Sequence, residues 1–197
     1  MKRTESGSGQ AGGLLLGLCA LLVVVGMFWP GGSSPAAADY QPMSAPARPV
    51  RLVVPSLGIR SAVKPIQIDQ QGVLDPPANV REVGWWQGSA RPGATRGQTV
   101  LTGHTVHTGG GVMDHLGQLR RGKLVKVVTP RGTMVYRTTR TLTLTKAALA
   151  RRAVELFGQK RTDDRLVLIT CSGWTGSEYT KNVVVFATPL GVPTKTS

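Results

Sequence analysis

The chain has 197 residues, of which 41% are hydrophobic, so it is long and apolar enough for one domain with a full core. Its formal net charge is +14, and a field of that sign favours an anionic partner. Nucleic acid is not the expected partner, because aromatic residues are only 5% of the chain and no DNA- or RNA-reading motif is present. Anionic lipid headgroups and cell-wall polymers are the remaining classes.

The N-terminus predicts a membrane anchor. Residues 1–13 form a polar cytoplasmic tail, and residues 14–29 form an uncharged apolar run. This run is shorter than a typical span of about 20 residues but longer than the usual signal-peptide core of about 7–15. Because Lys2 and Arg3 favour an inside N-terminus, we expect a transmembrane signal anchor with the rest of the chain extracellular. Cleavage at the Ala36-Ala37-Ala38 stretch is the alternative, although that stretch lies far from the apolar run.

The remainder divides into a linker, a domain and a short tail. Residues 30–48 are rich in Pro, Gly, Ala and Ser without an apolar period, which is typical of a disordered or extended stalk. Residues 49–191 are the predicted folded domain, and residues 192–197 a C-terminal tail. No internal repeat is present.

The domain is predicted to be mostly β-strand. Its β-prone segments are 50–54, 57–59, 63–69, 73–77, 83–86, 98–104, 123–129, 133–143, 166–171 and 183–187. Residues 130–132 read as a hairpin turn, and residues 114–119 as a single helical turn. One helix is expected at 146–157, with Thr145 as N-cap and Gly158 as its end. The apolar face of this helix comprises Leu149, Ala153, Leu156 and Phe157. Many short strands with one helix favour a single β-barrel or sandwich.

The two cysteines have different interpretations. Cys19 lies inside the apolar run and reads as an anchor residue, because Leu18 occupies the position where a lipidation box needs a small residue. Cys171 ends a buried strand far along the chain, so a disulfide with Cys19 is not expected. Since oxidising compartments tend to pair cysteines, a free thiol in an exported domain is unusual. Cys171 is therefore either a small buried hydrophobe or a nucleophile.

A nucleophilic cysteine needs a base, and three histidines are available. His104 is the best placed, because it ends a predicted strand, as Cys171 does, and Gly103 beside it permits close backbone approach. His107 and His115 lie in a Gly-rich, flexible-looking loop and are expected to face solvent. Three histidines and one cysteine without paired spacing fall short of a zinc pattern, so we expect no metal and no other cofactor.

These residues resemble a known family. The element Thr102-Gly103-His104-Thr105, followed after a basic hairpin by Leu168-Ile169-Thr170-Cys171 behind an N-terminal anchor, is similar to sortases over about residues 50–190. The stretches 171–174 (Cys-Ser-Gly-Trp) and 182–185 (Asn-Val-Val-Val) are most similar to the sortase class lettered F, or to a class E relative. The resemblance implies a closed eight-stranded β-barrel with one or two short helices.

The resemblance also implies an activity. A sortase is a cysteine transpeptidase that cleaves a Leu-Pro-x-Thr-Gly-like sorting signal between Thr and Gly. Cys171 would attack the threonine carbonyl and form a thioester, while His104 would protonate the leaving amine and deprotonate the incoming one. The implied partners are proteins with C-terminal sorting signals, and an amine acceptor on a peptidoglycan precursor or a pilin.

The sequence departs from the family at one site position. An arginine is expected at the start of the final strand, and here Asn182 stands there. An amide can donate to an oxyanion but brings no positive charge, so either protonated His104 or a basic residue from another strand would have to supply it, with Arg137 and Arg140 as the candidates. Asn182 reads equally well as a turn residue entering the strand. Trp174 and Tyr179 either line a groove for the signal's leucine and proline or pack the loop after Cys171.

Other classes fit less well. A papain-like peptidoglycan hydrolase usually has its cysteine before its histidine, and here the order is reversed. An L,D-transpeptidase usually follows its cysteine quickly with an arginine, whereas residues 172–174 are Ser-Gly-Trp. A non-catalytic β-domain that binds anionic wall polymers remains the alternative from a different class.

Overall fold

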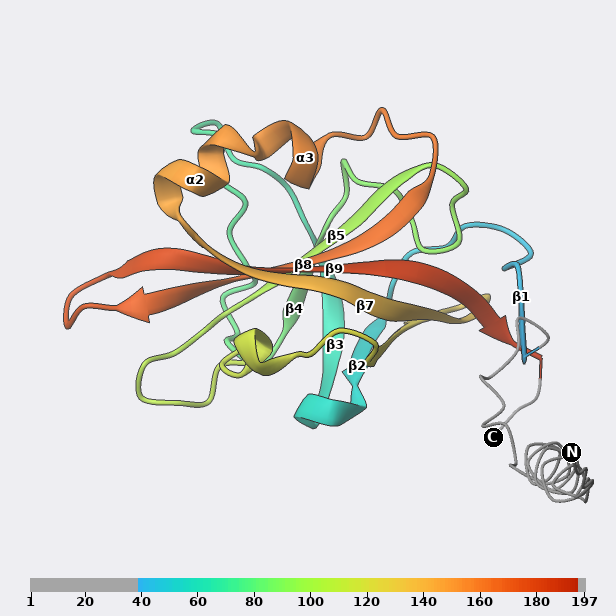
Figure 1. The fold of residues 1–197 in the computed structure, drawn as a ribbon, viewed down its shortest axis with the longest axis horizontal. Coiled ribbons are helices and arrows are strands. Elements are labelled where there is room, and N and C mark those ends of the chain that lie inside the picture. Colours follow the sequence, from blue (N-terminus) through green and yellow to red (C-terminus); the bar gives the residue numbers. More distant parts are fainter. Residues whose placement is uncertain (1–38, 195–197) are drawn as a thin grey trace, which may run out of the picture. The chain divides into compact units, whose positions relative to one another are not determined.

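Eight strands close into a barrel in the computed structural model, which describes residues 39–194 (Figure 1). They are β2 (Arg51–Val54), β3 (Ile59–Ile66), β4 (Val83–Trp86), β5 (Gly97–Gly103), β6 (Leu124–Thr129), β7 (Gly132–Thr145), β8 (Asp164–Trp174) and β9 (Tyr179–Pro193). The order around the barrel is β9-β7-β6-β2-β3-β4-β5-β8, and β8 pairs back onto β9. The predicted closed eight-stranded barrel is confirmed.

Local sequence explains much of the strand layout. The predicted hairpin at 130–132 joins β6 to β7 in antiparallel register. The predicted helical turn is the 3₁₀ helix η3 (Leu116–Gln118), and a second 3₁₀ helix, η2 (Pro55–Leu57), separates β2 from β3. Of the predicted piece 57–59 only Ile59 is in a strand, because Leu57 ends η2. The piece 63–69 is strand as far as Ile66, within β3, which continues through Pro65. The β-prone segment 73–77 is not a strand.

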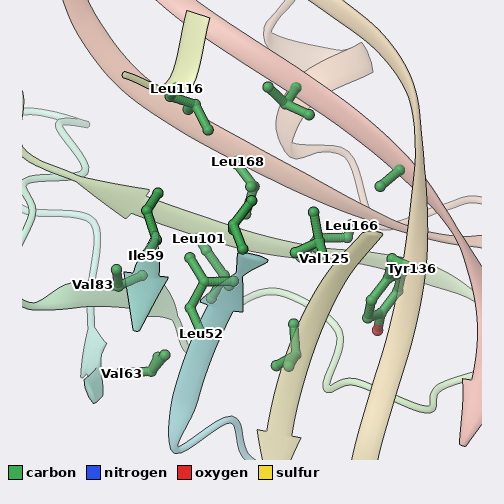
Figure 2. Packing of buried hydrophobic residues seen from close by; sticks show 14 of the residues in the cluster. Leu52, Ile59, Val63, Val83, Leu101, Leu116, Val125, Tyr136, Leu166 and Leu168 are labelled. Atoms are coloured by element: carbon green, nitrogen blue, oxygen red, sulfur yellow. The ribbon is translucent and has the colours of Figure 1, made fainter. Parts of the chain in front are cut away.

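Strand β8 is buried on both of its faces. Along a strand, successive side chains point to opposite faces. Leu166 and Leu168 accordingly join the core inside the barrel (Figure 2), whereas Val167 and Ile169 join a second apolar cluster. That second cluster includes Leu156 from the helical segment, so it lies between the barrel wall and the helices. Two-sided burial gives the continuous apolar run that marked this strand in the sequence.

The predicted single helix is two shorter helices. They are α2 (Lys146–Arg151) and α3 (Ala153–Phe157), separated at Arg152, which has non-helical dihedral angles (φ −102°, ψ 14°). The predicted N-cap is confirmed, because the Thr145 hydroxyl accepts a hydrogen bond from the Ala148 N–H at 3.1 Å. The predicted apolar face is wrong at Ala153, which is exposed because it begins the second helix after the break.

The folded unit begins before residue 49. Strand β1 (Tyr40–Gln41) pairs with Pro193 and Val192 at the end of β9, so neither segment is a free linker or tail. Met43 is 8% exposed and belongs to the barrel core, and the Ala47 N–H donates to the Pro92 carbonyl at 3.2 Å. The predicted stalk is therefore wrong for residues 39–48, because an apolar methionine inside the Pro/Ala-rich stretch packs on the barrel.

The predicted anchor, residues 14–29, lies outside the described residues, as do Cys19 and the stalk segment 30–38. Within residues 39–194, no helix is both long and apolar enough to cross a membrane.

Candidate active site

Cys171 and His104 lie on neighbouring segments: Cys171 is the eighth of the eleven residues of β8, and His104 directly follows Gly103, the last residue of β5. The predicted end of the strand at Cys171 is therefore wrong, because β8 continues to Trp174. Strands β5 and β8 pair in parallel, and the last pair of their ladder is Thr102 with Ile169. His104 and Cys171 each lie two residues beyond this last pair along their own segments. The Thr170 hydroxyl ties the strand ends together, because it donates to the Gly103 carbonyl at 2.6 Å. The pairing of β5 with β8 brings the two segments together, and the catalytic pairing of these side chains stays a prediction.

Gly103 is required by close packing beside His104. A Cβ atom added at Gly103 would lie 2.8 Å from Cγ1 of Val112 and 2.9 Å from Cγ of Met113. The Met113 N–H in turn donates to the His104 carbonyl at 3.0 Å. The expected close backbone approach at Gly103 is therefore present, and it comes from the following loop folding back on β5.

The Gly-rich loop after His104 is held by one carboxylate. Asp114 accepts from the Val106 N–H at 2.7 Å through Oδ1 and from the Gly111 N–H at 3.0 Å through Oδ2. These bonds fix the loop although its glycines gave no sign of order in the sequence.

His104 is oriented by a backbone carbonyl. Its Nε2 lies 2.9 Å from the Pro77 carbonyl oxygen. A carbonyl only accepts hydrogen bonds, so Nε2 carries a proton and Nδ1 holds the lone pair of the neutral ring. Nδ1 is then the ring atom that can accept a proton from a thiol.

Cys171 is a free, exposed cysteine. Burial of the sulfur by surrounding protein is the largest cause that raises its pKa, and Asp75 raises the pKa further. Lys146, the first residue of α2, acts in the opposite direction. A reactive thiolate therefore has to be formed by proton transfer to a base.

Asn182 lies directly across from Cys171. The two residues pair in the β8–β9 ladder, and Asn182 Nδ2 is 4.0 Å from the sulfur. The same amide donates to the Thr170 carbonyl at 3.3 Å, which fixes its orientation. An amide donor is thus held beside the sulfur, in a position suited to an oxyanion that forms on an acyl group attached there.

An aromatic wall borders the cavity that holds Cys171. Trp174 stacks on His107 with ring centroids 4.2 Å apart and planes inclined by 4°, and its centroid lies 5.0 Å from that of Tyr179. These three residues and Cys171 line a cavity of about 510 Å³. Trp174 and Tyr179, predicted either to line a groove or to pack the loop, do both.

Arg137 and Arg140 do not supply a positive charge to Cys171. Leu144 is the β7 residue that faces Asn182, so Arg140 lies four residues and Arg137 seven residues back along the strand. Arg140 Nη2 also bonds to Glu155 Oε1 at 2.6 Å. The basic side chain that acts on the sulfur is Lys146, which the sequence did not single out.

No group of three or more His, Cys, Asp and Glu side chains among residues 39–194 could hold a metal ion.

Comparison with known proteins identifies the family. The family model described as a sortase domain matches residues 52–190, which is more than half of the chain. The chain belongs to the sortase family.

Solved sortases share the fold of this sortase at low identity. Sortase A from Corynebacterium diphtheriae is 16% identical with a TM-score of 0.59, covering 78% of this chain and 66% of its own. Sortase C-1 from Actinomyces oris is 21% identical with a TM-score of 0.55, covering 74% and 75%. A pilus-related sortase C of Group B Streptococcus is 17% identical with a TM-score of 0.57, covering 78% and 71%. The chain thus spans about two thirds to three quarters of the length of these structures. Among curated proteins, no match was found.

Sequence reasoning missed three residues of this sortase site. His107 was expected only to face solvent, yet its exposed ring stacks on Trp174. Lys146 was assigned only to the start of a helix, and Pro77 only to an extended piece. His107 was the one with a usable signal, because it lies three residues after His104 in the same loop; the other two approach the site only through tertiary packing.

Proposed function

We propose that this sortase is a membrane-anchored cysteine transpeptidase that cleaves a Leu-Pro-x-Thr-Gly-like sorting signal between threonine and glycine. Residues 14–29 are the anchor, and the barrel lies outside the membrane. The acyl group passes to an amine of the cell envelope, on a peptidoglycan precursor or a pilin. The sequence elements at residues 171–174 and 182–185 assign it to class F or a class E relative.

The proposed reaction has two halves. The Cys171 proton moves to Nδ1 of His104, and the sulfur attacks the threonine carbonyl carbon. As the carbon–nitrogen bond breaks, His104 returns a proton to the departing glycine amine, which leaves a thioester on Cys171. The acceptor amine then loses a proton to His104 and displaces the sulfur, which regenerates the thiol.

Asn182 is proposed to donate to the oxyanion in both halves. Its Nδ2 is the side-chain amide donor 4.0 Å from the sulfur, and Lys146 is the cation that favours the thiolate. Asn182 thus supplies the hydrogen-bond donor and Lys146 the positive charge, two functions that one arginine has in the expected family pattern. The aromatic wall of His107, Trp174 and Tyr179 is proposed to receive the apolar residues of the signal.

One observation carries the proposal. The parallel pairing of β5 with β8 supports it, because it brings together the segments that carry His104 and the one free cysteine of residues 39–194, and that cysteine lines a cavity of about 510 Å³. A domain that only bound wall polymers would have no need of this arrangement.

The test uses the full-length chain in a non-ionic detergent. A fluorogenic library of Leu-Pro-x-Thr-Gly-like peptides should be cleaved between Thr and Gly, and mass spectrometry should detect an acyl adduct on Cys171. Cys171→Ala and His104→Ala should abolish turnover, whereas His115→Ala, an exposed loop histidine, should retain it. Turnover that survives Cys171→Ala would sink the mechanism. Absence of turnover with every peptide would favour the non-catalytic alternative.

A further inference from the structure

A second cavity on the barrel has four arginines among its nine lining residues. It has a volume of about 370 Å³, and its charged lining residues are Arg121, Arg140, Arg161, Arg165 and Asp163. The four arginines come from the loop before β6, from β7, from the loop before β8 and from β8 itself. Segments far apart in the sequence thus converge on one concentration of positive charge.

Two of these arginines are held in place from the barrel side. The guanidinium carbons of Arg140 and Arg165 each lie 4.6 Å from the ring centroid of Phe186. Arg165 Nε also donates to Gln98 Oε1 at 2.7 Å, and its Nη2 donates to the Glu155 carbonyl. Fixed guanidinium groups need less ordering when a ligand arrives, so they make a better binding site than free surface arginines.

The remaining two arginines keep unused donors. Arg161 Nη2 bonds to both oxygens of Asp163 at 2.8 and 2.9 Å, but its Nε is buried without any hydrogen-bond partner. A buried donor of this kind carries a desolvation cost that a ligand oxygen would remove. Arg121 is exposed and forms no ion pair with any residue among 39–194. The cavity therefore offers donors that no protein acceptor satisfies.

The cavity is remote from the catalytic end of the barrel. Arg165 is the second residue of β8 and Cys171 the eighth, so six residues of strand separate them, about 20 Å. Thr188 and Asp163 also line a neighbouring cavity formed with Tyr40 and Gln41 of β1. The cation cluster thus lies near the side of the barrel where β1 joins, while the β8–β9 hairpin projects on the other side (Figure 1).

We propose that this cavity is a binding site for a phosphate group, as a phosphomonoester or a phosphodiester, separate from the transpeptidation site. Planar guanidinium groups donate in pairs to phosphate oxygens, and several arginines can share the oxygens of one tetrahedral group. The position near β1 suits an anionic phospholipid headgroup; a free phosphate or the phosphodiester of a wall polymer has the same chemistry.

The test is calorimetric titration of the full-length chain in a non-ionic detergent. The probes are inorganic phosphate, glycerol 3-phosphate and short-chain phosphatidylglycerol below its micelle concentration. Arg121→Gln/Arg161→Gln should weaken phosphate binding by about ten-fold or more, since both partnerless donors are lost. The matched control is Arg60→Gln/Arg131→Gln, which removes the same charge from two exposed arginines elsewhere and should change binding less than about two-fold.

A variant that should bind phosphate more tightly shows that weaker binding in the double arginine variant is not caused by loss of folding. Asp163→Asn removes the one acidic residue of the lining and frees Arg161, so phosphate should bind several-fold more tightly. Glu82→Gln, which breaks the Lys64–Glu82 pair of 3.6 Å, is its control and should leave binding unchanged.

The relative affinities for the three probes distinguish a lipid headgroup from a soluble phosphate as the ligand. Tighter binding of phosphatidylglycerol than of glycerol 3-phosphate, lost in the double arginine variant, identifies a lipid headgroup; equal binding identifies a soluble phosphate. Equal weakening by the control pair, no measurable phosphate binding, or acetate binding as well as phosphate would each overturn the proposal.

Discussion

Cys171 depends on its neighbours for reactivity, because burial raises its pKa and two opposite charges act on it. Lys146 favours the thiolate and Asp75 disfavours it. The charges of Lys146 and Asp75 thus change the pKa of the Cys171 thiol in opposite directions. In the proposed mechanism, proton transfer to His104, whose Nε2 lies 2.9 Å from the Pro77 carbonyl oxygen, makes the sulfur reactive.

We expect alkylation of Cys171 to be slow at pH 7 and to rise steeply toward and above pH 9, because its pKa is raised. Lys146→Gln should slow alkylation near neutral pH and Asp75→Asn should speed it, each by up to about five-fold, as for a partly exposed charge pair. Iodoacetamide labelling followed by mass spectrometry of the Cys171 peptide measures this without interference from Cys19. A shift in the same direction for both variants would contradict the assignment, and Lys126→Gln is the control.

Substitutions at Asn182 distinguish its two interpretations, an oxyanion donor or a structural residue that enters the strand. Asn182→Ala should lower kcat by on the order of 10²-fold with little change in KM, because the interaction exists only in the transition state. Asn182→Asp should be at least as damaging, since a carboxylate accepts but does not donate. A purely structural role predicts lowered thermal stability instead, so melting temperatures are measured beside the kinetics.

The connection from β7 to β8 shows how an element serves the site. Thr145 caps α2, α2 begins with Lys146, and Lys146 Nζ pairs with Glu178 Oε2 of the β8–β9 turn at 3.0 Å. A local capping bond therefore sets the position of a cation that acts on the thiol.

Thr145→Ala should reduce the free energy of unfolding by about 1 kcal/mol, because the N-cap hydroxyl no longer accepts from the Ala148 N–H. Urea denaturation followed by circular dichroism measures the loss. Thr143→Ala, an exposed threonine on the same strand, is the matched control. Equal losses in the two variants would show that strand propensity, and not the cap, is being measured.

Met43 tests whether residues 39–48 belong to the fold. Its side chain is in the barrel core, so Met43→Ala should cost about 2–5 kcal/mol of unfolding free energy. Val73→Ala, at a residue 47% exposed, should cost much less. A stability unchanged by Met43→Ala would restore the interpretation of this segment as a simple stalk.

At the scale of the whole molecule, Asp164 links stability to pH. Burial, and secondarily the charge of Asp163, raises the pKa of Asp164 from 3.8 to about 6. A raised carboxyl pKa means that the folded state holds the proton more tightly than the unfolded state. The contribution of Asp164 to stability is therefore lost as the pH rises from about 4 to about 6.

Asp164→Asn should remove this pH dependence. At pH 7 the variant should be more stable than the parent by on the order of 1 kcal/mol, after allowance for solvent screening of a partly exposed group. Near pH 4 the two proteins should be almost equally stable. Urea denaturation at both pH values measures the difference, and a variant less stable than the parent at pH 7 would contradict the assignment.

The sequence predicted the features that depend on local pattern. The apolar run of β8, the hairpin at 130–132 and the Thr145 cap are all encoded by neighbouring residues. The break between the two helices at Arg152 was not predicted, because residues 146–157 contain no Gly or Pro. The Pro77–His104 bond and the influence of Lys146 on Cys171 join residues 27 and 25 positions apart through tertiary packing, so no local pattern contains them.

The pairing of β9 has a consequence for how an active molecule comes to exist. This last strand is hydrogen-bonded to β1, β7 and β8 and carries Asn182, so the ring closes only after about residue 193 has been synthesised. Pairings between segments so distant in the chain form late and slowly. A growing chain that still lacks β9 therefore has open strand edges and an unassembled thiol site. Transpeptidase chemistry is thereby delayed until β9 has been synthesised.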